Sequence, residues 1–265
     1  DQSERSCFKP VYPVRSIGPV DNFEYYFVGK AANHMKYDLK ISLPFYKVMY
    51  SIIFMAILII IRGISTSGEV MAALEPNIAL LAGIFFADNY YKEFSSGNIQ
   101  VFYRYSLQKK MSAMFRRCMI GGLYLWFLAA VACLVYMFLY HPLGYSFESN
   151  ISIMINTLTV CAISILFFGI LSFTITNFTQ NLGMGIGIFV IIWLCLSSKF
   201  AEYLPKCLRL FLLEESHQQL GTLTPYYLSR ILYLIMTVVL IFSNIYALNK
   251  EPKYKKKEWR GKYEH

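Results

Sequence analysis

From Ser149 to Ser198 the chain runs for fifty consecutive residues without an Asp, Glu, Lys or Arg. A water-soluble domain carries roughly 25% charged residues, whereas this chain of 265 residues carries 15% and is 56% hydrophobic. A membrane-spanning helix, by contrast, needs about 20 predominantly apolar residues in a row. The uncharged block therefore excludes the soluble enzyme classes and predicts an integral membrane protein.

The apolar runs predict an all-α fold with six transmembrane helices, because a backbone inside a bilayer has to satisfy its polar groups within the helix. The uncharged block is too long for one crossing and breaks at the polar stretch 177–181. The expected spans are about Phe45–Ile61, Val70–Tyr91, Cys118–Tyr140, Ile151–Thr176, Leu182–Ser198 and Ile231–Leu248. Together with a helix that precedes them, they form a predicted transmembrane domain over residues 22–248.

Basic residues are unevenly distributed between the two predicted sides of the membrane. Twenty of the 25 Lys and Arg residues lie in 1–47, 88–117 and 249–265, and five lie on the other side. Because Lys and Arg concentrate in cytoplasmic loops, both termini are expected in the cytoplasm, with a cytoplasmic segment at 1–21 and a basic tail at 249–265. The net charge of +9 is then a topology signal, and no nucleic-acid partner is expected.

An amphipathic helix is expected ahead of the first span, over about 22–43. Most charged residues lie off a stripe of apolar residues that recur at every fourth position. The stripe consists of Phe23, Phe27, Ala31, Met35, Leu39 and Leu43. This pattern is typical of a helix that lies in the membrane interface. A helix packed on a cytosolic partner is the alternative.

Ionisable residues are scarce within the predicted spans. Glu75 and Asp88 are expected near the two ends of the second span, at the interface, since a charged side chain deep in a bilayer is costly. The chain has no nucleotide-binding P-loop, and its four His and six Cys residues lack metal-ligand spacing. We therefore expect no catalytic site, metal or cofactor on this chain; an intramembrane enzyme that uses Glu75 or Asn156 is a further hypothesis.

Polar and small residues in the spans predict contacts between helices. Asn156, Asn177 and Asn244 can hydrogen-bond to neighbouring helices, and Asn156 is also a candidate for the substrate path. Gly183 and Gly187 lie four residues apart at the start of the fifth span. Small residues at this spacing allow close helix packing, within the chain or across a dimer.

The connection after the second span carries a recognisable pattern. It reads Glu93-Phe-Ser-Ser-Gly97, then Tyr105-Ser106-Leu-Gln-Lys109-Lys110, and Arg116-Arg117 lead into the third span. This resembles the ABC-2 type (type-2 exporter) permeases of ATP-binding-cassette transporters, although Tyr105 stands where Pro often occurs. The layout is similar too: an interfacial "elbow" helix, six spans and a long external loop, here about 199–230.

The resemblance implies that residues of about 92–117 form a coupling segment that docks on a separate ATP-binding-cassette ATPase subunit. Its mixture of charged and apolar residues suits short docking helices. The implied contact residues are Glu93, Gly97, Tyr105, Ser106, Lys109 and Lys110. ATP and Mg would bind to that partner, and a second permease subunit, identical or homologous, would complete the path.

The function implied is export of an amphipathic or hydrophobic substrate, with a membrane-active peptide favoured, across the cell membrane. The chain has many Phe, Tyr and Met residues that suit such a cargo, although aromatic belts at the membrane interface need them equally. The alternative from another class is a membrane scaffold or immunity protein that binds its ligand without transport.

Overall fold

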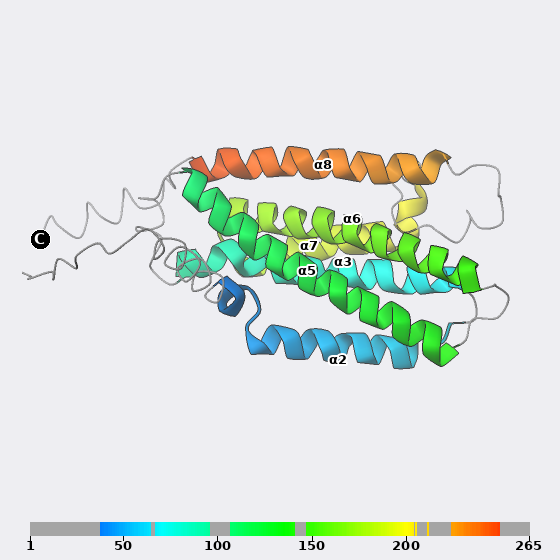
Figure 1. Ribbon diagram of the computed structural model, residues 1–265. Coiled ribbons are helices and arrows are strands. Elements are labelled where there is room, and N and C mark those ends of the chain that lie inside the picture. Colours follow the sequence, from blue (N-terminus) through cyan, green and yellow to red (C-terminus); the bar gives the residue numbers. More distant parts are fainter. Residues whose placement is uncertain are drawn as a thin grey trace, which may run out of the picture. The chain divides into compact units, whose positions relative to one another are not determined.

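All six predicted apolar runs are helical in the computed structural model, which describes residues 38–64, 67–95, 107–140, 147–203, 205, 211 and 224–249. The helices are α2 (Phe45–Ile61), α3 (Ser67–Ser95), α5 (Leu107–Tyr140), α6 (Phe147–Thr179), α7 (Leu182–Ser197), the 3₁₀ helix η1 (Lys199–Tyr203) and α8 (Thr224–Asn249) (Figure 1). The described backbone contains no strand. The predicted all-α fold class is confirmed.

Four of the helices are long and apolar enough to cross a membrane. The apolar stretches are Glu69–Asn89 of α3, Gln108–Leu139 of α5, Ile151–Thr179 of α6 and Leu228–Ala247 of α8. The helices α2 and α7 are apolar but have only 17 and 16 residues. At about 1.5 Å per residue they measure roughly 25 Å, which is shorter than the hydrocarbon core of about 30 Å.

Successive long helices run in opposite directions. The helices α3, α6 and α8 end on the side where α2, α5 and α7 begin (Figure 1). We call this side the basic end, because its described residues include Lys40, Lys47, Lys109, Lys110, Arg116 and Arg117. The other side, with the end of α2 and the start of α8, is called the opposite end.

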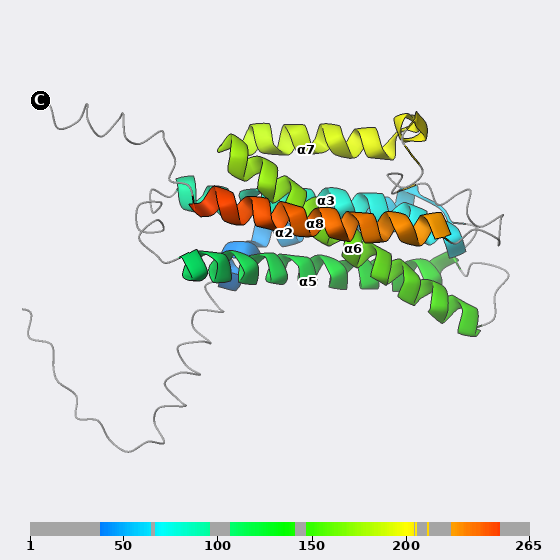
Figure 2. The same ribbon diagram turned by 90° about the horizontal axis from the view of Figure 1, so that it is seen from above.

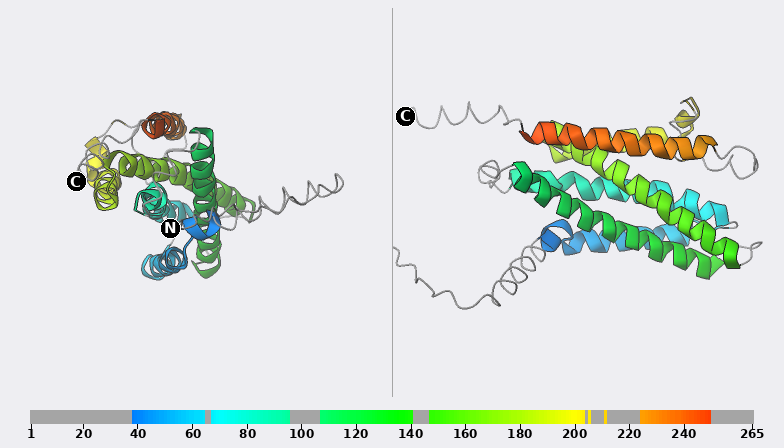
Figure 3. Two further views of the ribbon diagram at one scale, coloured as in Figure 1. Left: turned by 90° about the vertical axis from the view of Figure 1, so that its left-hand side faces the viewer. Right: turned by 45° about the horizontal axis from the view of Figure 1, so that its top comes forward.

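The centre of the bundle is built from α3 and α6, which share the most extensive contact between any two helices in the described part of the chain. The helices α5 and α7 also pack on α3, and α8 packs on α6 (Figures 2 and 3). Glycine allows the closest approach: a Cβ atom on Gly83 of α3 would lie 2.0 Å from the ring of Phe189 in α7.

The fifty-residue uncharged block folds as two helices joined by a tight turn, as predicted. Gln180, between α6 and α7, has φ = 52°, and its N–H donates to the carbonyl of Thr176 at 2.9 Å. The side chain of Asn181 caps α7 by accepting from the N–H groups of Gly183 and Met184 at 3.0 and 3.3 Å. Asn is a favoured N-cap because its side-chain oxygen satisfies free N–H groups of the first turn.

Two predicted loops are partly helical. Residues 92–95 complete α3, and residues 107–117 form the first three turns of α5, so separate short helices are not found at 107–117. In the predicted external loop 199–230, the first five residues form η1 and residues 224–230 begin α8. Of the predicted elbow helix (22–43) only 38–43 lie in the described part, and 38–42 of these are helical; residues 1–37 and 250–265 lie outside it.

Candidate functional site

An ion pair between α3 and α8 lies inside the bundle near its opposite end. Glu75 of α3 is fully buried, and Arg230 of α8 is 4% exposed. The Arg230 guanidinium bonds both carboxylate oxygens, Nη1 to Oε1 and Nη2 to Oε2, the latter at 2.9 Å. Ser164 of α6 donates to the same Oε1 at 2.7 Å. Three helices therefore meet at one carboxylate. The contact with Arg230 is bidentate, a geometry that makes Arg–carboxylate bonds strong.

The residue that follows Glu75 accepts a hydrogen bond from a fourth helix. The indole Nε1 of Trp193 in α7 donates to the carbonyl of Pro76 at 2.8 Å. Pro76 lies inside α3 and has no N–H, which removes one helical hydrogen bond. The side chain of Asn77 donates to the carbonyl of Ala73 at 2.7 Å. This turn of α3 is thus joined by polar bonds to α6, α7 and α8.

A second buried ion pair joins α3 to α2 toward the basic end. The Lys47 ammonium of α2 donates to the Asp88 carboxylate and to the carbonyl of Phe85, the latter at 2.9 Å. It also lies 5.1 Å from the centre of the Phe85 ring. Lys47 is only 2% exposed, so its charge is neutralised inside the protein rather than by water.

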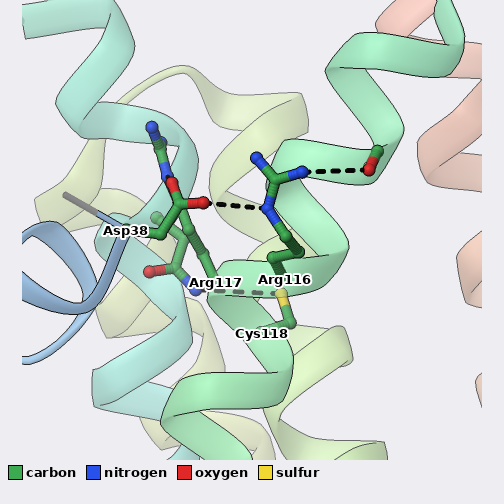
Figure 4. Close-up of polar contacts among 6 residues, drawn as sticks. Asp38, Arg116, Arg117 and Cys118 are labelled. Atoms are coloured by element: carbon green, nitrogen blue, oxygen red, sulfur yellow. Dashed lines mark hydrogen bonds and ion pairs between the residues drawn. The ribbon is translucent and has the colours of Figure 1, made fainter. Parts of the chain in front are cut away.

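A third charged cluster lies where the helical turn 38–42 meets α5. The Asp38 carboxylate accepts from Nε of Arg116 at 2.9 Å, and Nε of Arg117 lies 3.6 Å from its other oxygen (Figure 4). Arg116 also donates to the hydroxyl of Ser112 at 3.3 Å. One carboxylate is therefore shared by two guanidinium groups.

The asparagines were predicted to hydrogen-bond between helices, and this is confirmed for two of them. Asn177 of α6 donates to the side-chain oxygen of Asn244 in α8 at 3.2 Å. Asn244 in turn donates to the hydroxyl of Thr174 at 2.6 Å. Asn156 lies on the exposed face of α6 instead.

The predicted coupling residues fall partly outside the described ranges. Glu93 lies in the last turn of α3, and Lys109 and Lys110 lie in the first turn of α5. Lys109 is exposed and Lys110 is buried. Gly97, Tyr105 and Ser106 are outside the described residues. The structure thus brings Glu93 and the two lysines to the basic end.

The glycines at the start of α7 divide into two groups. Gly183 and Gly187 are exposed, and a Cβ atom on Gly187 would have no atom within 4 Å. Gly185, between them, is buried, and its Cβ would lie 2.3 Å from the hydroxyl oxygen of Thr176. Close packing within the chain therefore uses Gly185, whereas Gly183 and Gly187 present an open face.

The partners of the buried charges are not evident from the sequence. Glu75 was expected at the interface, but its side chain is enclosed by protein, and Arg230 was counted only as a charge of the external loop. Lys47 was likewise counted only as a topology charge. A usable signal was present, because the predicted topology puts the two members of each pair at the same end of the bundle.

The three charged clusters fasten helices to one another. In the described part of the chain, no group of three or more His, Cys, Asp and Glu residues is arranged to hold a metal ion. No family model, no curated protein and no solved structure matches this chain. The helix arrangement and the charged contacts are therefore the basis for assigning a function.

Proposed function

We propose that this chain is the permease subunit of an ATP-driven exporter whose energy comes from a separate ATP-binding-cassette ATPase subunit. The supporting observation is the position of α3. It is the most enclosed of the four long apolar helices, it is ion-paired toward both of its ends, and its C-terminal end leads into the segment that resembles a coupling segment.

A stiff α3 provides a mechanical link between the two ends of the bundle. Its 29 residues measure about 44 Å, and Glu75 and Asp88 lie roughly 20 Å apart along it. A displacement of the C-terminal end of α3 would carry α2 through Lys47–Asp88 and α8 through Arg230–Glu75. Packed helices shift as rigid bodies in conformational switches. Closure of the ATPases at the basic end would therefore reorient α2 and α8.

The same proposal includes the arrangement in the cell membrane. All six apolar helices cross the bilayer, and the shorter α2 and α7 are accommodated by local thinning of the lipid. The basic end and both termini are cytoplasmic, in keeping with the distribution of Lys and Arg. The elbow helix lies in the interface, and a second permease subunit, identical or homologous, completes the path.

The cargo that fits the outward-facing apolar side chains of the helices is amphipathic or hydrophobic, and a membrane-active peptide is the favoured candidate. In α5, Phe127 and Phe138 are 64% and 78% exposed. A cargo of this type could move along such surfaces without full hydration, although lipid contact requires them too.

Site-specific photo-crosslinking tests the proposal. Lys109, in the first turn of α5, is replaced by benzoylphenylalanine in the full chain within its own host membranes. The matched control carries the probe at Tyr203, which is 87% exposed and lies toward the opposite end. We expect the probe at position 109 to capture an ATP-binding-cassette ATPase and the probe at 203 to capture none. The product should disappear with Glu93→Ala and Gly97→Ala.

Two outcomes would reject the exporter. One is a folded, membrane-inserted chain that yields no ATPase product from position 109 or from further positions in 96–106. The other is biological activity that persists when the captured ATPase cannot hydrolyse ATP. The second result would instead identify a scaffold or immunity protein that binds its ligand without transport.

A further inference from the structure

The charged cluster at the basic end presents cationic side chains to its surroundings. It comprises Asp38, Lys40, Arg116 and Arg117, which are three cations and one carboxylate; we call it the Asp38 cluster. Both guanidinium groups approach the same carboxylate (Figure 4). Lys40 is exposed in the same helical turn as Asp38. Lys40 and Arg116 are both exposed, so they can attract an anion from outside the bundle.

Arg116 is the cluster member best placed to bind that anion. Its side chain is 48% exposed. A guanidinium group has five N–H donors, and in the described part of the chain Arg116 bonds Asp38 through Nε and Ser112 through Nη1. The remaining donors match the oxygens of a phosphate group, which Arg binds with two parallel hydrogen bonds.

An apolar face of α5 begins directly beside Arg116. Phe115, Met119 and Leu123 are 65%, 41% and 60% exposed. They follow one another at intervals of four residues, so they lie on one face of the helix. Leu39, beside Asp38, is 50% exposed as well. Cationic groups next to a continuous apolar track match a molecule with an anionic head and acyl chains.

We infer that the Asp38 cluster and the face formed by Phe115, Met119 and Leu123 bind one anionic phospholipid. Its phosphate is held by Arg116, with Lys40 nearby, and its acyl chains lie along α5. Basic pockets beside transmembrane helices bind anionic headgroups in this way. The apolar track favours a lipid over an acidic protein surface, because the acyl chains of a lipid would cover it. The inference requires membrane insertion but no ATPase.

Lipid titration of the full chain tests this site. The purified protein in detergent is titrated with phosphatidylglycerol or phosphatidylcholine, and the bound lipid is counted by native mass spectrometry. We expect preferential binding of phosphatidylglycerol. Arg116→Gln should lower that affinity about fivefold, which corresponds to about 1 kcal/mol for one basic residue. The matched control Arg62→Gln, an exposed arginine at the other end of α2, should leave it unchanged.

Two further variants separate lipid binding from damage to the fold. Arg116→Lys keeps the charge and should retain part of the affinity. Asp38→Asn removes the carboxylate that competes with the phosphate, so the affinity for phosphatidylglycerol should rise. A loss of fold would instead lower binding in both variants.

The inference is overturned if both lipids bind the wild type equally, or if Arg116→Gln and Arg62→Gln lose the same affinity. It is also overturned if millimolar inorganic phosphate displaces phosphatidylglycerol, because the acyl track would then contribute nothing. If Arg116→Gln keeps lipid binding but loses the ATPase crosslink, the cluster binds a protein. That last result would leave the exporter proposal intact.

Discussion

The helices α3 and α5 have similar lengths but opposite surroundings. In α3, 72% of the apolar stretch is buried inside the bundle, against 28% in α5. The buried helix carries Glu75 and Asp88, whereas α5 has no charged residue between Cys118 and Tyr140. In a membrane protein, charged side chains face the interior of the bundle and apolar ones face the lipid. In these two helices, the one that carries the charged residues is therefore also the one that lies deeper within the bundle.

The comparison also separates two kinds of contact. The charged groups of α3 bond to α2, α6 and α8, so under the exporter proposal a movement of α3 would be transmitted to specific neighbours. Between Cys118 and Tyr140, by contrast, α5 offers its surroundings only uncharged side chains. Variants in α3 should accordingly have larger effects than matched variants on outward-facing surfaces.

The largest effect is expected at the Glu75–Arg230 pair. Glu75→Ala leaves a buried cation without its carboxylate, and breaking a buried ion pair in this way costs about 3–5 kcal/mol of unfolding free energy. Unfolding in mixed micelles with increasing denaturing detergent measures it. The double variant Glu75→Leu with Arg230→Met should recover most of the stability, since apolar replacements of buried ion pairs are often neutral. A single variant as stable as the wild type would refute the pair's role.

A smaller effect is expected from a methyl group added between α3 and α7. In Gly83→Ala the new Cβ would lie 2.0 Å from the ring of Phe189, which is fully buried. Such overpacking costs about 1–3 kcal/mol. The matched control is Gly187→Ala, whose Cβ meets no atom within 4 Å, and it should be neutral or stabilising by up to about 1 kcal/mol. Thermal unfolding of both variants in the same detergent checks this, and equal destabilisation would contradict the packing.

The smallest effect is expected at the hydrogen bonds between α6 and α8. Asn244→Leu removes the bonds to Asn177 and Thr174. Polar bonds of this kind in membranes are worth about 0.6–1.7 kcal/mol. The control Asn156→Leu, on the exposed face of α6, should change stability by less than about 0.5 kcal/mol. If Asn156→Leu proved as destabilising as Asn244→Leu, the assignment of inner and outer faces would be wrong.

The positions of the apolar runs and of the polar stretch 177–181 were sufficient to predict the helices and the turn in the uncharged block, because a bilayer restricts both the length and the polarity of a span. The same reasoning failed at residues 107–117. There, charged and apolar residues are mixed in the helical turns that precede the uncharged part of α5, and the mixture resembles a loop. An amphipathic helix and a charged loop have similar amino-acid compositions, so composition does not distinguish them.

Contacts between distant residues require more than this reasoning: the predicted topology puts both partners at one end of the bundle but does not pair them. Glu75 and Arg230 are separated by 155 positions, and a rule that places single charges at the interface takes no account of a partner so far away. The spacing of Gly183 and Gly187 predicts close packing either within the chain or across a dimer. Within the chain, the glycine of α7 that packs closely on α6 is Gly185, and contact across a dimer stays a prediction.

The most direct test of the mechanism follows one distance across the opposite end of the bundle. Spin labels replace Ile60 of α2 and Leu228 of α8, which are 77% and 57% exposed, in the permease–ATPase complex in lipid nanodiscs. We predict that vanadate trapping after ATP hydrolysis shifts the distance distribution. The shift should be lost in the Glu75→Leu, Arg230→Met variant, where α8 is no longer ion-paired to α3. Identical distributions with and without trapped nucleotide, while ATP hydrolysis continues, would contradict transmission through α3.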